Sequence, residues 1–162
     1  MLYQLTYFCA NQGLKTGFLG VNIPGKKVTL WDEGKAPFSA TTLPDIGKAL
    51  VQVLKPENYE KTANRYLYVE SYTITQIQLK GVLEKVSGAS WTAETLDSRA
   101  VEKESAEKLK NGDFSAIPKL IGGVSYGYRR LGDFSSYGLA NDEIGLPRGD
   151  IEADVKAVLD SV

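Results

Sequence analysis

Four aromatic side chains lie close together in a glycine-rich stretch near the end of the chain. They are Tyr126, Tyr128, Phe134 and Tyr137, and they fall within residues 125–149. Ligand pockets are commonly lined by aromatic side chains and built on loops. The pattern predicts that Tyr126, Tyr128 and Phe134 form a lid or wall around an aromatic substrate. The alternative is a loop whose rings pack on the last two helices.

Two further aromatic residues flank a predicted strand at residues 27–31. Phe18 precedes this strand and Phe38 follows it, each in a loop rich in glycine or proline. Ligands of open α/β sheets bind beyond the carboxyl ends of the strands, so Phe38 is expected to line a substrate pocket. Phe18 is a second candidate for the same pocket. Core packing is the alternative for both rings.

The charged residues near these loops suggest little acid–base chemistry. Lys15 and Lys35 could contact a cofactor phosphate, although a solvated lysine is the ordinary alternative. Asp32 and Glu33 have the character of turn residues, and Asp45 suits the first turn of a helix. No second acid is positioned across a cleft, which argues against a hydrolase with paired carboxylates.

Metal and nucleophile chemistry are poorly supported by the composition. The chain has no histidine, the commonest metal ligand and general base, and Cys9 is its single cysteine. Neither a disulfide framework nor a thiolate cluster can form from one cysteine. Cys9 lies among aromatic residues and is expected to be buried rather than reactive.

The charge balance argues against nucleic-acid and membrane partners. The net charge is −1, and basic residues occur as short pairs rather than as a stripe. No run approaches the roughly 18 apolar residues of a membrane span. With a lone cysteine and no glycosylation signal, a cytoplasmic location is expected.

The residues between 27 and 88 predict two strand–helix pairs. The expected strands are 27–31 and 65–72, and the expected helices are 42–54 and 73–86. Thr42 and Thr73 are the predicted N-caps, and Gly88 is the predicted left-handed stop. This order is typical of the back half of a nucleotide-binding α/β sheet.

The sequence turns helical after a short predicted strand at residues 90–96. Asp97 or Ser98 is expected to cap a charged helix through residue 110, and Asp113 a second helix through residue 124. Asp150 is expected to cap the last one. The fold class is therefore α/β, with strand–helix–strand–helix followed by a mainly helical lobe.

Six stretches of the chain resemble one known family in the same order and spacing. They are 13–20 (GLKTGFLG), 32–39 (DEGKAPFS), 45–49 (DIGKA), 65–69 (RYLYV), 112–114 (GDF) and 141–147 (NDEIGLP). On these residues the chain resembles the C-terminal half of fungal NmrA-like, isoflavone-reductase-like oxidoreductases, which are atypical short-chain dehydrogenases of Rossmann type.

The resemblance implies a protein of two parts. An N-terminal Rossmann half would bind NADP(H) and carry the glycine-rich loop and the catalytic lysine, so no catalytic residue is assigned here. Residues 13–162 would form the C-terminal part, with sheet-completing elements to about residue 96 and a helical substrate lobe over 97–162. Residues 1–12 diverge from the family, and the family places the loop around Phe18 near the substrate.

The expected function is therefore that of the substrate-binding half of an NADPH-dependent reductase acting on a small aromatic or carbonyl-type molecule. No G-x-G-x-x-G follows a strand, so this chain alone is expected to bind no cofactor and to be inactive. The expected partners are the small-molecule substrate and either the missing Rossmann half or another protein. The alternative is a non-catalytic regulator that senses dinucleotides or binds a protein.

Overall fold

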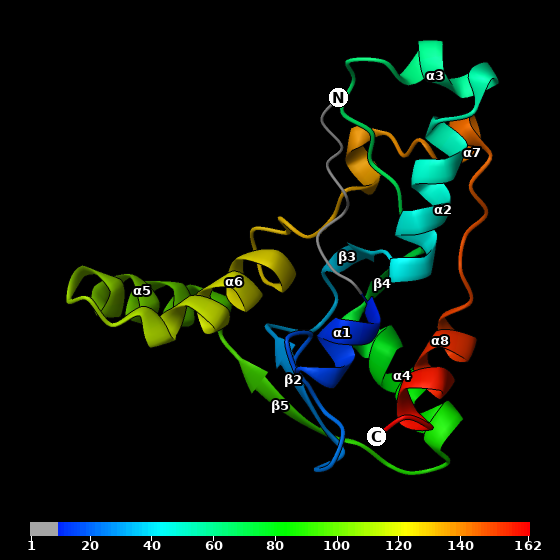
Figure 1. Ribbon diagram of the computed structural model, residues 1–162. Coiled ribbons are helices and arrows are strands. Elements are labelled where there is room, and N and C mark those ends of the chain that lie inside the picture. The colour runs from blue at the N-terminus through cyan, green and yellow to red at the C-terminus, as the bar shows by residue number, and fades with distance from the viewer. Residues whose placement is uncertain (1–9) are drawn as a thin grey trace.

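The protein is a mixed α/β chain, seen in a computed structural model that describes residues 10–162 (Figure 1). The interpretation of Cys9 lies outside the described residues, as does most of the divergent segment 1–12. The strands are β1 (Val21–Asn22), β2 (Lys27–Trp31), β3 (Pro37–Ala40), β4 (Tyr72–Thr75) and β5 (Thr92–Leu96). The helices are α1 (Ala10–Lys15), α2 (Leu43–Val53), α3 (Pro56–Thr62), α4 (Gln76–Ser87), α5 (Ser98–Lys110), α6 (Ile117–Tyr126), α7 (Asn141–Ile144) and α8 (Ile151–Leu159), with 3-10 turns η1 (Phe114–Ala116) and η2 (Ser135–Tyr137).

The strands form two small sheets. In the first, the order is β1-β2-β5, and β2 runs antiparallel to β1 but parallel to β5. In the second, β3 and β4 pair antiparallel, with Phe38 opposite Ile74. Because β2 and β5 are parallel, their carboxyl ends lie at the same edge of this sheet.

Strand β2 obtains part of its edge pairing from a side chain. Alternate residues of a strand present their N–H and C=O groups to the same edge, and β1 reaches only the first two residues of β2. Further along that edge, the backbone N–H of Trp31 donates to Gln76 Oε1 at 2.8 Å. Gln76 Nε2 in turn donates to the carbonyl of Thr29 at 2.9 Å. The buried Gln76 amide thus makes the two hydrogen bonds that a neighbouring strand would otherwise make at this edge of β2.

The predicted helix caps are largely confirmed. Thr42 caps α2 by accepting from the backbone N–H of Asp45, and Gly88 ends α4 in the left-handed conformation. Asp97 caps α5 and Asp150 caps α8 through their carboxylates. These caps occupy N–H groups that a helix cannot satisfy itself.

Some element predictions were wrong. The strand predicted at residues 65–72 does not form: Tyr68 makes one isolated bridge to Leu139, and the strand of this region is β4, which begins at Tyr72. The capping box of α4 is accordingly Thr75 with Gln78, not Thr73 with Gln76. Asp113 caps the 3-10 turn η1 rather than α6 directly. Sequence patterns also missed α1, α3 and β3, which are short elements held by tertiary contacts.

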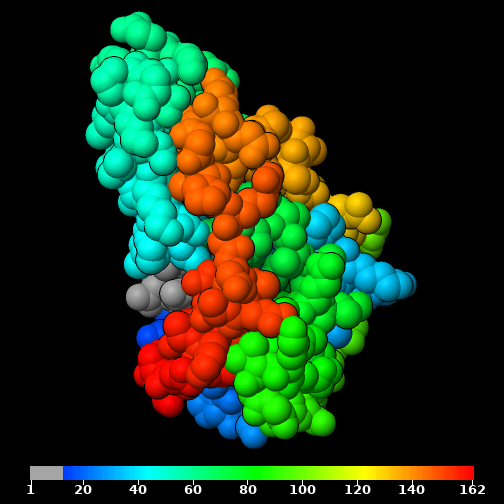
Figure 2. All heavy atoms as spheres, turned by 90° about the vertical axis from the view of Figure 1, so that its right-hand side faces the viewer, coloured from blue at the N-terminus to red at the C-terminus, as the bar shows by residue number. Residues whose placement is uncertain are grey.

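The buried apolar side chains form two clusters, one in the lower and one in the upper part of the molecule as it is seen in Figure 1. The larger cluster lies between the β1-β2-β5 sheet and helices α4 and α8, and the smaller one between α2, the 67–69 segment and α7. The segment between α7 and α8 runs from one part to the other (Figure 2). Helices α5 and α6 pack against each other as an arm beside the sheet (Figure 1). The expected division at residue 96 stays a prediction.

Helix α2 buries only part of the face predicted for it. The spacing of apolar residues in the sequence predicts one buried face made of Leu43, Ile46, Leu50, Val53 and Leu54. Val53 is buried, whereas Leu43, Leu50 and Leu54 are 54%, 49% and 54% exposed. The buried positions are Asp45, Ala49 and Val53. Leu43, Leu50 and Leu54, together with Val51, therefore form an exposed stripe, here called the α2 face.

Replacing Gln76 with methionine should destabilise the chain by about 2–4 kcal/mol, because it leaves the Trp31 N–H and the Thr29 carbonyl unpaired. Gln78→Met, on the exposed side of the same helix, should cost no more than about 1 kcal/mol. Urea unfolding followed by circular dichroism gives both values. Equal losses for the two variants would show that the Gln76 bridge contributes nothing special.

Candidate functional site

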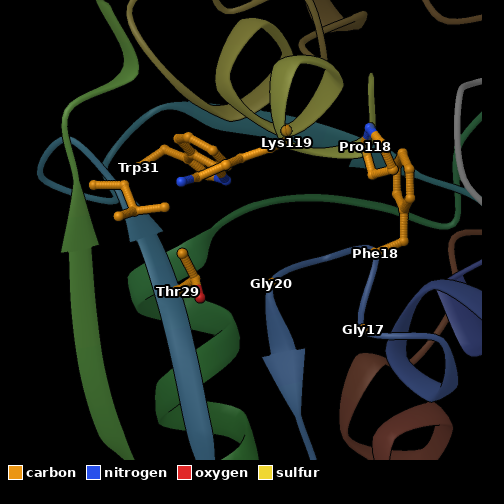
Figure 3. A pocket seen from close by; sticks show the side chains of 9 residues that line it. Gly17, Phe18, Gly20, Thr29, Trp31, Pro118 and Lys119 are labelled. Carbon is orange, nitrogen blue, oxygen red and sulfur yellow. The ribbon is translucent and has the colours of Figure 1, made fainter. Parts of the chain in front are cut away.

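A cavity of about 280 Å³ lies between the 17–20 loop, strand β2 and the first turn of α6 (Figure 3). The residues that line it are Gly17, Phe18, Gly20, Thr29, Trp31, Leu96, Pro118, Lys119 and Gly122. Trp31 and Leu96 are the last residues of the parallel strands β2 and β5. The cavity therefore lies beside the carboxyl ends of these strands, where α/β sheets bind ligands.

The Trp31 indole is held between a strand and a helix. Its backbone is fixed by Gln76, and its ring lies against α6 at Gly122. A Cβ at Gly122 would come within 2.7 Å of the indole atom Cζ2. Glycine is thus required there because it lets the helix backbone touch the ring.

A tight turn holds Phe18 on the opposite side of the cavity. The N–H of Gly20 donates to the carbonyl of Gly17 at 2.9 Å, and both glycines have positive φ angles of 77° and 75°. The carbonyl of Gly20 then accepts from the N–H of Thr29 at 2.7 Å, which ties the turn to β2. Phe18 stands beside Pro118 in Figure 3. The structure thus places this predicted site residue on a cavity.

Phe38 and Tyr126 lie in the core instead. Each is 1% exposed, and their rings meet edge to face with centroids 4.9 Å apart. Burial raises the pKa of the Tyr126 hydroxyl well above its usual range. Phe38 is on β3 rather than in a loop, which explains why it packs inward. Both rings therefore pack inside the protein, which is the alternative to pocket lining that was given for each of them in the sequence analysis.

Tyr128 lies on the outer surface against α5. Its hydroxyl donates to Glu102 at 2.7 Å, and its ring lies under Arg99 and near Arg129, with guanidinium carbons 4.2 and 5.3 Å from the centroid. Hydrogen bonds from Arg129 and then Tyr128 lower the pKa of Glu102 to about 2. Tyr128 therefore fastens the chain after α6 to α5.

Phe134 belongs to a third location. Its ring stacks on Tyr68 with centroids 5.6 Å apart, and Tyr137 completes a group of three rings. The structure thus separates the predicted aromatic cluster into a core ring, a surface ring and this group. None of these four rings lines the 280 Å³ cavity next to Phe18. Tyr126 and Tyr128 instead border a second cavity of about 240 Å³, which Trp31 and Lys35 also line. A substrate role for Phe38, Tyr126, Tyr128 and Phe134 stays a prediction.

The loop charges behave as structural groups. Lys35 pairs with Glu33 at 2.6 Å, and Asp32 accepts from both the backbone N–H and the hydroxyl of Ser98. Lys15 lines a neighbouring open cavity of about 330 Å³ beside β1. Sequence patterns did not select Trp31 or Lys119. Trp31 carried a usable signal, because it ends a predicted strand on the ligand-binding side.

The described residues do not fit a dinucleotide or a metal. Such a cofactor needs free N–H groups at a glycine-rich junction between a strand and a helix. Helices α2, α4 and α5 each follow a strand, but no glycine lies at any of these three junctions. Thr42, Thr75 and Asp97 each also accept one of the first-turn N–H groups. Within residues 10–162, no group of three or more acidic or cysteine side chains could hold a metal ion.

The chain is similar in sequence to fungal proteins named oxidoreductases. It is 30% identical over 144 residues to oxidoreductase aprR of Aspergillus flavus, a match covering 88% of this chain and 48% of that protein. It is 29% identical over 103 residues to oxidoreductase poxI of Penicillium oxalicum, covering 64% of this chain and 32% of poxI. The chain thus spans about half the length of aprR and about a third of the length of poxI. No known family profile matches it.

A solved structure shows the fold. A nucleoside-diphosphate-sugar epimerase from Staphylococcus aureus superposes with a TM-score of 0.63 over 95% of this chain and 50% of the epimerase, at 15% identity. The chain has an oxidoreductase/epimerase-like fold. The predicted α/β Rossmann-type class is therefore confirmed.

Among the described residues, no helix combines the length and apolar character that crossing a bilayer requires. The cytoplasmic location stays a prediction.

Adding one methyl group at Gly122 should disturb the cavity. Gly122→Ala should cost about 1–3 kcal/mol of stability, because its Cβ overlaps the rigid Trp31 ring, and it should change the near-ultraviolet circular dichroism of the indole. Gly47→Ala is the matched control, since its Cβ would meet nothing within 4 Å on exposed α2, and it should gain up to about 1 kcal/mol. A Gly122→Ala protein as stable as Gly47→Ala would contradict this packing.

Proposed function

We propose that this chain is the substrate-binding half of an NADPH-dependent reductase of the NmrA-like, isoflavone-reductase-like type, acting on a small aromatic or carbonyl-type molecule. The observation that carries the proposal is the cavity beside Trp31, at the carboxyl ends of β2 and β5. The oxidoreductase names of aprR and poxI support the reaction class.

The cavity suits a small ring better than a nucleotide. Its walls are formed by the Phe18 and Trp31 side chains together with Pro118, and flat apolar surfaces favour flat apolar ligands. Its volume, about 280 Å³, lies at the small end of ligand pockets. In this proposal the chain binds and orients the substrate, and the nucleotide-binding half supplies the cofactor.

The chain alone should neither bind NADPH tightly nor oxidise it, because the helix starts that follow its strands are already capped. The test is to capture the native protein with an antibody, determine its intact mass, and assay NADPH oxidation with a panel of aromatic carbonyl compounds. A species near twice the 17.7 kDa of this chain should be active, whereas the chain alone should not.

Two results would contradict the reductase proposal. One is robust NADPH oxidation by the purified chain, which would place the cofactor site within it. The other is a larger native species that binds NADPH but reduces none of the panel. A native mass near 17.7 kDa would instead favour the second function below.

The α2 face favours a second candidate function, that of a non-catalytic protein-binding regulator. Apolar patches of this kind commonly mark interfaces, and Leu43, Leu50, Val51 and Leu54 expose one on a single helix. In the reductase the occupant would be the nucleotide-binding half. In a regulator it would be a partner protein.

The exposed α2 face should make the isolated chain self-associate. Replacing Leu50 and Leu54 with glutamate should shift the chain to a monomer in sedimentation velocity without loss of helix, because charge on the stripe opposes its burial. Phe114→Glu is the control, since Phe114 is even more exposed but lies on η1, and it should change nothing. A wild-type chain that stays monomeric at high concentration would exclude docking through this face.

A further inference from the structure

The cavity beside Trp31 has one charged group on an otherwise uncharged wall. Phe18, Trp31 and Pro118 supply flat apolar surface, and Lys119 is the single charged residue among the nine that line the space. The Lys119 side chain reaches from the first turn of α6 towards Trp31 (Figure 3). A cation and two aromatic rings therefore face the same small volume.

The charge of Lys119 is not cancelled by its acidic neighbours. Lys27 lowers the pKa of Glu94, and Lys108 lowers that of Glu104, with Lys119 adding a smaller effect on both. Each carboxylate is already in an ion pair with its own lysine. Within residues 10–162, Lys119 makes no salt bridge. The two ion pairs are each neutral, so the charge of Lys119 remains in excess by one in this neighbourhood.

We propose that the cavity selects a planar aromatic anion, with the ring between Trp31 and Phe18 and a carboxylate or similar oxyanion at the Lys119 ammonium group. This inference rests on the proposed function and names the charge of its substrate. Aromatic surface alone would accept neutral and charged rings alike. The unpaired ammonium group is what discriminates between them.

The expected discrimination is moderate. A hydrogen bond to a charged group is about twice as strong as a neutral one, but Lys119 is exposed and water screens part of its attraction. We expect an aromatic carboxylate to bind roughly tenfold more tightly than its neutral carboxamide, with the difference shrinking as salt is added.

The test uses 2-naphthoate and 2-naphthamide, which share a ring and differ in charge. Each is titrated into the 162-residue chain labelled with nitrogen-15, and the two tryptophan indole N–H signals are followed by NMR. Naphthoate should shift the Trp31 signal at lower concentration than naphthamide. The Trp91 signal serves as an internal reference. The Trp91 indole N–H donates to the Ser87 hydroxyl at 3.0 Å, and Trp91 does not line the cavity.

Three variants separate charge from packing. Lys119→Met should remove the preference for naphthoate, and Lys119→Arg should keep it, because arginine restores the cation. Lys103→Met removes an exposed lysine of α5 outside the cavity and should leave the preference unchanged. Dispersion of the amide spectrum shows whether each variant is folded, and the salt titration of the wild-type chain tests the charge independently of any variant.

The outcomes distinguish this inference from the proposed function. Equal affinity for the two probes at Trp31, or a preference that survives in Lys119→Met, overturns the anion selectivity and leaves an aromatic pocket in place. No shift of Trp31 with either probe overturns both the selectivity and the pocket. Selective naphthoate binding in a native protein that binds NADPH yet reduces nothing would uphold the inference and reject the reductase.

Discussion

The cavity beside Phe18 and Trp31 depends on the Gln76 side-chain amide, which makes hydrogen bonds to β2 where no neighbouring strand does. Gln76 starts α4 and gives β2 the two hydrogen bonds that β1 is too short to provide. Because Trp31 is one of the residues bonded, the same amide fixes the backbone from which the indole reaches the cavity. A buried amide with both of its groups used in this way contributes to stability, whereas a half-used one would cost free energy. The sheet edge and the cavity wall therefore share one support.

Packing at glycines completes this arrangement from the other side. Gly122 lets α6 approach the indole closely, and the positive-φ turn at Gly17 and Gly20 brings Phe18 to the same space. These constraints act on backbone segments that are far apart in sequence. The cavity is consequently a product of tertiary contacts rather than of any one loop, and its walls are held in fixed positions by these contacts.

The sequence predicted the parts of the fold that depend on local signals. Strand β2, helices α2, α4, α5 and α8 and most of their caps follow from propensity and capping chemistry, which act within a few residues. The strand expected at residues 65–72 did not form because aromatic and β-branched content favours a half-buried surface but does not supply a neighbouring strand, and only Tyr68 makes a bridge there. Among the candidate site residues, Phe18 lines the cavity at the strand ends, and Phe38 packs in the core because β3 turns it inward. Tyr126 is buried against Phe38, and with Tyr128 it borders a separate cavity. Lys119 could not have been selected, since nothing local distinguishes it from a solvated lysine.

The α2 face and the cavity beside Phe18 and Trp31 differ in shape and in charge. The α2 face is a convex apolar stripe, which offers area to a large partner but no enclosure for a small molecule. The cavity beside Trp31 encloses a small volume and adds a cation, which suits a ligand with one flat and one charged end. Neither surface has the glycine-rich helix start that a pyrophosphate needs, and Thr42, Thr75 and Asp97 each already accept one N–H at the helix starts that follow strands. The cavity beside Phe18 and the helix starts that follow strands are therefore formed by different residues, so a change in one need not alter the other.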